Sequence, residues 1–129
     1  MPKFFLLFNH TLTPGQQECA HRELGVDAII EAPPELRHSW ANIPPNIADL
    51  HSWLQPVRNW LTAHDLPDDY VLIQGDFGAC YLLVRFALEC GFVPVYATTE
   101  RHAREQHLED GRVLVEHTFS HVRFRRYGT

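Results

Sequence analysis

Short apolar runs alternate along the chain with segments that carry helix signals, and this alternation restricts the fold more than any other feature of the sequence. The runs are four to six residues long and rich in β-branched or aromatic side chains, which favours buried strands over helices. They occupy residues 3–8, 26–30, 70–73 and 93–97. Because a strand–helix–strand unit pairs its strands in parallel, the sequence predicts an α/β fold with a mostly parallel sheet and helices on both faces.

The first helix is marked at both of its ends. Thr13, Pro14 and Gln16 form a capping-box pattern with proline at the first helical position. Gly25 is placed to stop the helix after about Leu24. A helix therefore connects the first two predicted strands.

The rest of the chain supplies two further helices and a pair of final strands. Apolar residues recur every three or four positions over residues 45–64, which predicts a helix with a bend at Pro56. Residues 79–90 predict another, apolar helix. Two short apolar runs, 113–115 and 122–124, predict two strands in a C-terminal β-hairpin. A length of 129 residues fits one domain over residues 1–129.

Composition excludes several classes of protein. Eleven Lys and Arg against sixteen Asp and Glu give a net charge of −5, which argues against non-specific binding to duplex nucleic acid or anionic membrane. The apolar runs are far shorter than the roughly 18 residues of a membrane-spanning helix. Cys19, Cys80 and Cys90 are odd in number and lack Cys-x-x-Cys spacing, so we expect neither a disulfide framework nor a zinc ribbon. No signal-peptide pattern follows the first residues, and we expect a cytoplasmic protein.

Positive charge gathers towards the end of the chain. Six of the eleven cationic residues lie in the last 29 positions, and residues 121–129 contain no acid, so an anionic ligand is expected there. A solvated edge strand whose charges block association is the alternative for the last two arginines. The six residues are Arg101, Arg104, Arg112, Arg123, Arg125 and Arg126.

Polar segments follow three of the predicted strands. Ligands of parallel sheets bind beyond the carboxyl ends of the strands, where the strand order reverses. If the order begins 2-1-3-4, that point lies between the first and third strands. The segments are Asn9, His10, Thr11 and Thr13 after the first strand, Gln74, Gly75, Asp76, Phe77 and Gly78 after the third, and Thr98, Thr99, Glu100 and Arg101 after the fourth.

The turn between Gly75 and Gly78 has two interpretations. Two glycines allow a ligand to approach the free amide groups at a helix N-terminus, where anions are favoured. The same turn also fits a tight strand-to-helix loop in which Asp76 caps the helix. It is neither a Walker A loop nor a full dinucleotide fingerprint, and we expect no cofactor.

His10 and Arg101 are the side chains with the most useful chemistry. A neutral imidazole can accept a proton from a hydroxyl near pH 7, which makes His10 a candidate general acid or base, with a turn histidine bonded to backbone as the alternative. The guanidinium of Arg101 can donate two hydrogen bonds to phosphate, or else pair with Glu105 on a short helix.

Nine histidines raise the question of a metal site. His102 and His107 are five residues apart and do not share one helix face, and His117 and His121 in a strand or turn fit no zinc pattern. We therefore expect no metal. No Ser-His-Asp order or nucleophile elbow is present, and the cysteines of the apolar helix are not expected to be activated.

The three tryptophans lie in one proline-rich stretch, which leaves their role open. Trp40, Trp53 and Trp60 are interpreted most simply as core packing groups. The alternatives are stacking on a nucleobase or contact with a partner protein, the latter typical of a structural or interaction protein.

A family resemblance rests on three stretches in this order and at these separations. They are Phe8-Asn9-His10-x-Leu12-Thr13, then residues 70–79 (YVLIQGDFGA), then residues 94–101 (PVYATTER) followed by Asp110-Gly111 and residues 121–125 (HVRFR). Together they resemble the small CRISPR-associated proteins of type III loci in the Csx naming series, most closely the member numbered twenty. The resemblance covers nearly the whole chain.

The resemblance implies a Rossmann-like fold and ring-nuclease activity that linearises cyclic tetra-adenylate, a cyclic oligoadenylate messenger of antiviral defence. His10, Asn9 and Thr99 are then the expected catalytic residues, and the Gly75–Gly78 turn holds phosphate without a metal. A homodimer with the ring near its two-fold axis is expected, and a binding module that does not cut the ring is the alternative. The other expected ligand-binding residues are Thr11, Thr13, Gln74, Asp76, Phe77, Thr98, Glu100, Arg101 and Arg123.

Overall fold

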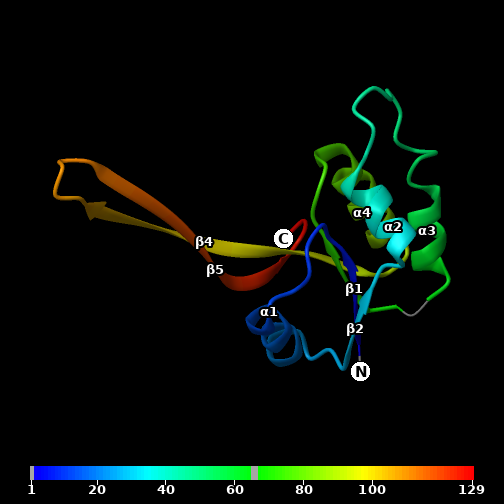
Figure 1. Ribbon diagram of the computed structural model, residues 1–129. Helices are drawn as coiled ribbons and strands as arrows, with labels where there is room; N and C mark the ends of the chain where they lie inside the picture. Colours follow the sequence, from blue (N-terminus) through cyan, green and yellow to red (C-terminus); the bar gives the residue numbers. More distant parts are fainter. Residues whose placement is uncertain (1, 65–66) are drawn as a thin grey trace.

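A computed structural model describes residues 2–64 and 67–129, in which five strands form one sheet (Figure 1). The strand order is β2-β1-β3-β4-β5, so the order reverses between β1 and β3. β2, β1, β3 and β4 are parallel, and β5 is antiparallel to β4, which confirms the predicted mostly parallel α/β sheet. The strands are β1 (Lys3–Leu7), β2 (Ala28–Glu31), β3 (Tyr70–Ile73), β4 (Val93–His107) and β5 (Val113–Arg126).

Helices cover both faces of the sheet because successive side chains of each strand point to opposite sides. Phe4 and Leu6 of β1 belong to one core cluster, and Phe5 and Leu7 belong to the other. The first cluster is closed by α1 (Pro14–Cys19) and the π-helix η1 (Ala20–Leu24), and the second by α2 (Pro34–Ala41), α3 (Gln55–Thr62) and α4 (Phe77–Glu89). Among the described residues no helix is long and apolar enough to cross a membrane.

The first helix begins as its sequence predicts. The Gln16 amide donates to the Thr13 hydroxyl at 3.2 Å, and the Thr13 amide donates back to Oε1 of Gln16 at 2.9 Å. Gly25 ends the helical segment in the left-handed conformation, at φ 68°, that glycine adopts without steric cost.

The predicted helix over residues 45–64 is wrong. Only α3 (Gln55–Thr62) is helical there, and residues 42–54 form turns and loop between it and the earlier helix α2. Prolines explain the difference, because the Pro44-Pro45 pair supplies no backbone donors and Pro56 starts α3 instead of bending a longer helix.

Two of the three tryptophans are core residues. Trp40 is 2% exposed and belongs to the cluster under α4. Trp60 packs edge-on against Phe5, with ring centroids 5.6 Å apart. Trp53 is 36% exposed. The proline- and tryptophan-rich stretch therefore mainly completes the core.

The two predicted final strands, 113–115 and 122–124, are wrong as separate elements, because both belong to the single strand β5. β5 pairs with β4, which continues to His107, well past its predicted end at residue 97. The antiparallel pairing is consistent with a C-terminal hairpin made from these longer strands. A β-bulge interrupts the register between Thr98 and Thr99.

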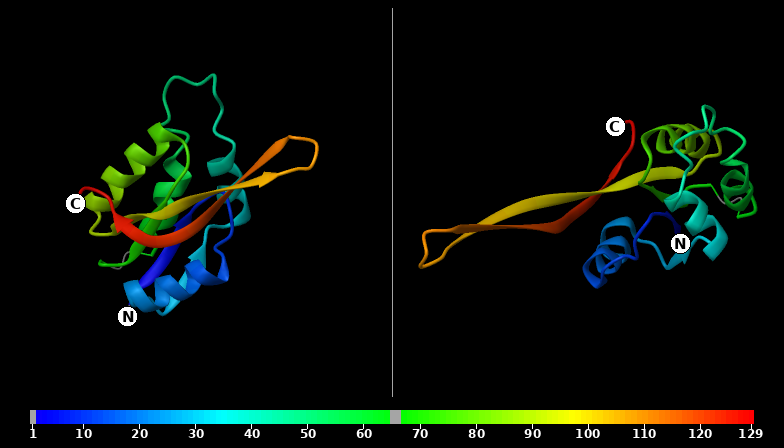
Figure 2. Two further views of the ribbon diagram at one scale, coloured as in Figure 1. Left: turned by 90° about the vertical axis from the view of Figure 1, so that its left-hand side faces the viewer. Right: turned by 45° about the horizontal axis from the view of Figure 1, so that its top comes forward.

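Beyond this bulge, residues 99–121 form a two-stranded ribbon, here called the arm. It projects away from the rest of the domain, which we call the body (Figure 2). All residues from 99 to 107 and from 109 to 120 are exposed.

Candidate functional site

The carboxyl ends of three neighbouring strands are tied together by Gln74. Its backbone amide donates to the Leu7 carbonyl at 3.1 Å, and its side-chain Oε1 accepts from the backbone amide of Ala97 at 2.7 Å. The carbonyl of Gln74 accepts a hydrogen bond of 2.8 Å from Nε1 of Trp40. The backbone and the side chain of Gln74 thus together link three strand ends and Trp40 at this edge of the sheet.

The turn after β3 has the structural role that its sequence also allowed. Oδ2 of Asp76 accepts from the Ala79 amide at 3.0 Å and so caps α4. A Cβ at residue 75 would lie 2.9 Å from Nε1 of Trp40, so Gly75 is required by the close approach of that indole. The turn leaves Phe77, at the start of α4, 95% exposed.

A pocket of about 570 Å³ opens beside this turn, between α4, β4 and Tyr127, the residue that follows β5. Four of its nine lining residues are aromatic, and its size lies in the usual range for small-molecule sites. Its lining residues are Gln74, Gly75, Phe77, Cys80, Tyr81, Val84, Arg85, Tyr96 and Tyr127.

Two arginines lie over tyrosine rings that line this pocket, although only Arg85 is itself a lining residue. The guanidinium carbon of Arg85 is 5.7 Å from the centroid of the Tyr81 ring. That of Arg125 is 5.6 Å from the centroid of Tyr96, whose hydroxyl also accepts from Nη1 of Arg125 at 3.0 Å. The pocket therefore offers flat apolar surfaces with positive charge beside them, a combination suited to a planar ring that carries an anion.

The deep wall of the pocket contains no activated nucleophile. The Tyr127 hydroxyl donates to the Ile73 carbonyl at 2.6 Å, and burial raises the pKa of Tyr127 to about 12. Burial also raises the pKa of the Cys80 thiol. Both groups stay protonated near neutral pH, as expected from sequence for the cysteine.

His10 is separate from the pocket lining. It lies exposed in the segment between β1 and α1, and its ring contacts Phe8 edge-on at 5.4 Å between centroids. Within the described part of the chain it makes no hydrogen bond, so its ring nitrogens are free to meet a ligand. Asn9 and Thr11 are exposed beside it, whereas Thr13 is engaged in capping α1.

The residues expected after β4 lie partly at the bulge and partly on the arm. The Thr98 hydroxyl donates to the Arg123 carbonyl at 3.1 Å and accepts from the Arg123 amide at 3.2 Å, so this pair closes the bulge. Glu100 lies 3.6 Å from Nε2 of His102. The alternative of a short helix pairing Arg101 with Glu105 is wrong, because both lie in β4.

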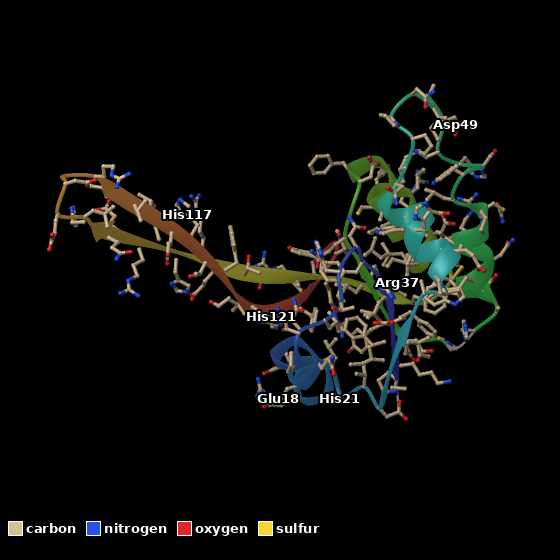
Figure 3. All side chains as sticks on the ribbon, viewed as in Figure 1. Glu18, His21, Arg37, Asp49, His117 and His121 are labelled. Atoms are coloured by element: carbon tan, nitrogen blue, oxygen red, sulfur yellow. The ribbon has the colours of Figure 1, made fainter. Side chains whose placement is uncertain are left out.

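Arg101 has a different partner. Its Nη2 is 3.0 Å from Nδ1 of His117, the residue that Figure 3 places about midway along the arm. The structure therefore brings Gln74, Gly75 and Phe77 together in one pocket, but it places Arg101 outside the pocket lining.

His121 is a further candidate that the sequence analysis did not place in the site. It pairs across the strands with Thr99, and its ring lies 4.7 Å from that of Phe124 between centroids. Both ring nitrogens are shielded from solvent and lack a protein partner among the described residues. Burial lowers the pKa of His121, so the ring is neutral and able to accept a proton.

Within residues 2–64 and 67–129, no group of three or more His, Cys, Asp and Glu side chains is placed to hold a metal ion. The tyrosines and the arginine that line the pocket were not predicted from the sequence. Tyr81 and Arg85 are visible as a pair one turn apart on the predicted apolar helix. Tyr127 joins the pocket only through the pairing of β5 with β4, which brings its ring to 4.8 Å from that of Tyr96 between centroids.

Comparison with known proteins identifies the family. Residues 2–125 match the family described as "Uncharacterized protein MJ1673 family". The chain belongs to the MJ1673 family. A relative from Methanocaldococcus jannaschii, "Uncharacterized protein MJ1673", is 46% identical over 127 residues, which cover 98% of each chain. No solved structure matches this chain. The match of the MJ1673 family to residues 2–125 takes in both the pocket turn and the arm.

Proposed function

We propose that this protein binds and linearises a cyclic oligoadenylate, with cyclic tetra-adenylate as the substrate, and so ends antiviral signalling of type III CRISPR systems in the cytoplasm. The pocket beside the turn that follows β3 carries the proposal, because it puts four aromatic side chains and Arg85 beside Gly75. The carboxyl end of a strand is where the ligands of a Rossmann-like sheet bind. A pocket of about 570 Å³ suits one nucleotide unit of a larger ring.

The pocket fits the adenine and phosphate of that unit. Phe77 and Tyr81 present exposed ring faces on which a base can stack, and stacking is worth about 1–3 kcal/mol per base. Arg85 and Arg125 supply charged donors for phosphate oxygens beside these rings. The ring's next linkage then lies across the sheet edge towards the segment that carries His10.

Cleavage at that linkage needs no metal. The ribose 2′-oxygen bonds to the adjacent phosphorus while its proton passes to His10, and the bond from phosphorus to the 5′-oxygen breaks. The 5′-oxygen leaves with a proton returned by the imidazolium or by water. The product is a linear oligoadenylate with a 2′,3′-cyclic phosphate and a 5′-hydroxyl. Asn9 and Thr99 orient the linkage, and Arg101 stabilises the developing charge on the phosphorane.

The size and symmetry of cyclic tetra-adenylate also support a homodimer, which we propose. A cyclic tetra-adenylate is larger than the one pocket, and its rotational symmetry matches two copies of the same pocket about a two-fold axis. Each copy then holds one half of the ring.

The direct test incubates the purified protein with radiolabelled cyclic tetra-adenylate in EDTA under single-turnover conditions. We expect linear product with a 2′,3′-cyclic phosphate end, at a rate that added Mn²⁺ does not change. Activity only with metal would contradict the mechanism. Binding without cleavage would instead establish the alternative, a module that sequesters or senses the ring.

A pair of variants on α4 tests the pocket itself. Phe77→Ala is expected to weaken ring binding by about 5- to 150-fold, which corresponds to the loss of one stacked base. Leu88→Ala is the matched control, because Leu88 is 54% exposed on the same helix and does not line the pocket. Equal affinities of the two variants for the ring, measured by calorimetry, would show that the pocket is not part of the binding site.

A further inference from the structure

The arm is amphipathic, although both of its faces are exposed. Residues paired across an antiparallel ribbon share a face, and faces alternate along each strand. One face, here called the apolar face, carries Val113, Val115 and Phe119, which are 46%, 51% and 67% exposed. Its other members are Thr99, Arg101, Ala103, Glu105, His107, His117 and His121. The opposite, polar face consists of Glu100, His102, Arg104, Gln106, Leu114, Glu116, Thr118 and Ser120.

A ribbon of this kind needs a surface to lie on. An isolated two-stranded ribbon is at best marginally stable in water, and alternation of apolar and polar residues is typical of strands with one buried face. The body of its own chain does not supply that cover, because the arm projects beyond it (Figure 2).

We propose that the apolar face of the arm packs against a second copy of this chain and forms the interface of the homodimer. This inference rests on the proposed function in one respect: the symmetry of the cyclic tetra-adenylate requires two copies of the chain. The arm begins at Thr99, directly at the sheet edge that holds the candidate site, so an interface on the arm adjoins that site.

The charges of the apolar face favour a second copy over a nucleic acid or an acidic partner. With histidines neutral, this face carries one cation, Arg101, and one anion, Glu105, and has no net charge. Such a face can lie on the body of a second copy without bringing a net charge into the interface. A nucleic acid would instead require an excess of positive charge.

The size of the arm indicates a reciprocal contact. Nine residue pairs from Thr99 to His107, each about 3.4 Å long on a ribbon about 10 Å wide, give a face of roughly 300 Å² in projection. A standard interface buries about 800 Å² on each partner. Exchange of arms, in which each copy's arm lies on the other copy, doubles the contact and brings it closer to that size.

The geometry also separates Arg101 from its own site. Arg101 is held by His117 on the projecting arm, whereas His10 belongs to the body. In a dimer with exchanged arms, Arg101 therefore reaches the ring bound by the body of the partner subunit.

Light scattering after size exclusion, at about 50 μM protein, tests the interface. Wild type is expected at twice the monomer mass of 14.9 kDa. The double variant Val115→Asp with Phe119→Asp places two carboxylates on the apolar face and is expected to weaken the dimer by at least about 100-fold. The matched control, Leu114→Asp with Thr118→Asp, adds the same charge to the polar face and is expected to remain dimeric.

Circular dichroism verifies that each variant is folded, and replacement of residues 101–119 by a short Gly-Ser turn gives a second, independent route to a monomer. A monomeric wild type, an apolar-face variant that stays dimeric, or loss of the dimer in both double variants would each overturn the proposal. Ring cleavage is assayed separately, so a dimer with this pattern that does not cut the ring contradicts the proposed function alone.

Discussion

The body and the arm share one sheet, but the side chains of their strands differ in burial. In the body, β1 and β3 are five and four residues long, and their side chains are buried under helices on both faces. In the arm, β4 and β5 extend as a ribbon of exposed residues. The comparison teaches that the buried contacts of this chain lie in the body, whereas almost all side chains of the arm remain exposed.

Removal of the body's acid–base group is expected to have the largest effect. His10→Ala should slow ring cleavage by about 10²- to 10⁴-fold, the usual contribution of a general acid or base, and leave ring binding within several-fold. Single-turnover rates and equilibrium binding of the same preparation separate the two effects. A variant that cleaves like wild type would assign a structural role to His10 and move the acid–base role to His121 or His117.

Two phenylalanines compare the contributions of body and arm to folding. Phe5 is fully buried and Phe119 is 67% exposed. Phe5→Ala should lower the free energy of unfolding by about 3–5 kcal/mol, because it leaves a cavity in the core. Phe119→Ala should change it by less than about 0.5 kcal/mol in the monomer. Urea unfolding at low protein concentration measures both, and similar losses would mean that the arm is part of the folding core.

Mixed dimers show which chain supplies Arg101 to each site. If the arm acts on the partner subunit, a heterodimer of His10→Ala with Arg101→Ala contains one intact site and one doubly altered site. Equal amounts of the two inactive variants should then recover about one quarter of wild-type activity after subunit exchange. Each variant alone is the baseline. No recovery would place Arg101 in the same site as His10 of its own chain.

The smallest expected effect concerns pH at the junction of body and arm. Burial lowers the pKa of His121, so the unfolded chain binds more protons than the folded one just below pH 6.5. Stability should therefore be fully present above about pH 6.5 and fall as the pH drops towards the lower folded pKa. Thermal unfolding from pH 7.5 to 5 should show a shallower decline for His121→Gln. An identical decline would exclude His121 as its source.

The strands of the body were predictable because burial on both faces produces short apolar runs that are visible in any window of the sequence. The cap at Thr13 was predictable because its partner Gln16 is three residues away. The extension of β4 was not, since residues 98–107 are polar apart from Ala103 and become a strand only by pairing with β5. The residue pattern within a short window of sequence does not show whether a distant segment will pair with it as a strand.

The candidate site also has one part that the sequence predicts and one part that it does not. The edge residues after β1 and β3 follow from strand order, and the structure places Gln74 at the centre of that edge. The pocket's aromatic wall required knowledge of side-chain packing, because Tyr127 reaches the Ile73 carbonyl across 54 positions of sequence.

The hydrogen bond from the Trp40 indole to the Gln74 carbonyl places a natural fluorophore behind the pocket. Trp40 is 2% exposed, so its emission reports the polarity of the peptide group it binds more than that of bulk water. A ligand that turns the Gln74 peptide changes this contact without touching the tryptophan. The indole N–H resonance of Trp40 in a ¹H–¹⁵N spectrum of the ¹⁵N-labelled protein is thus expected to follow occupancy of the pocket with no extrinsic probe attached.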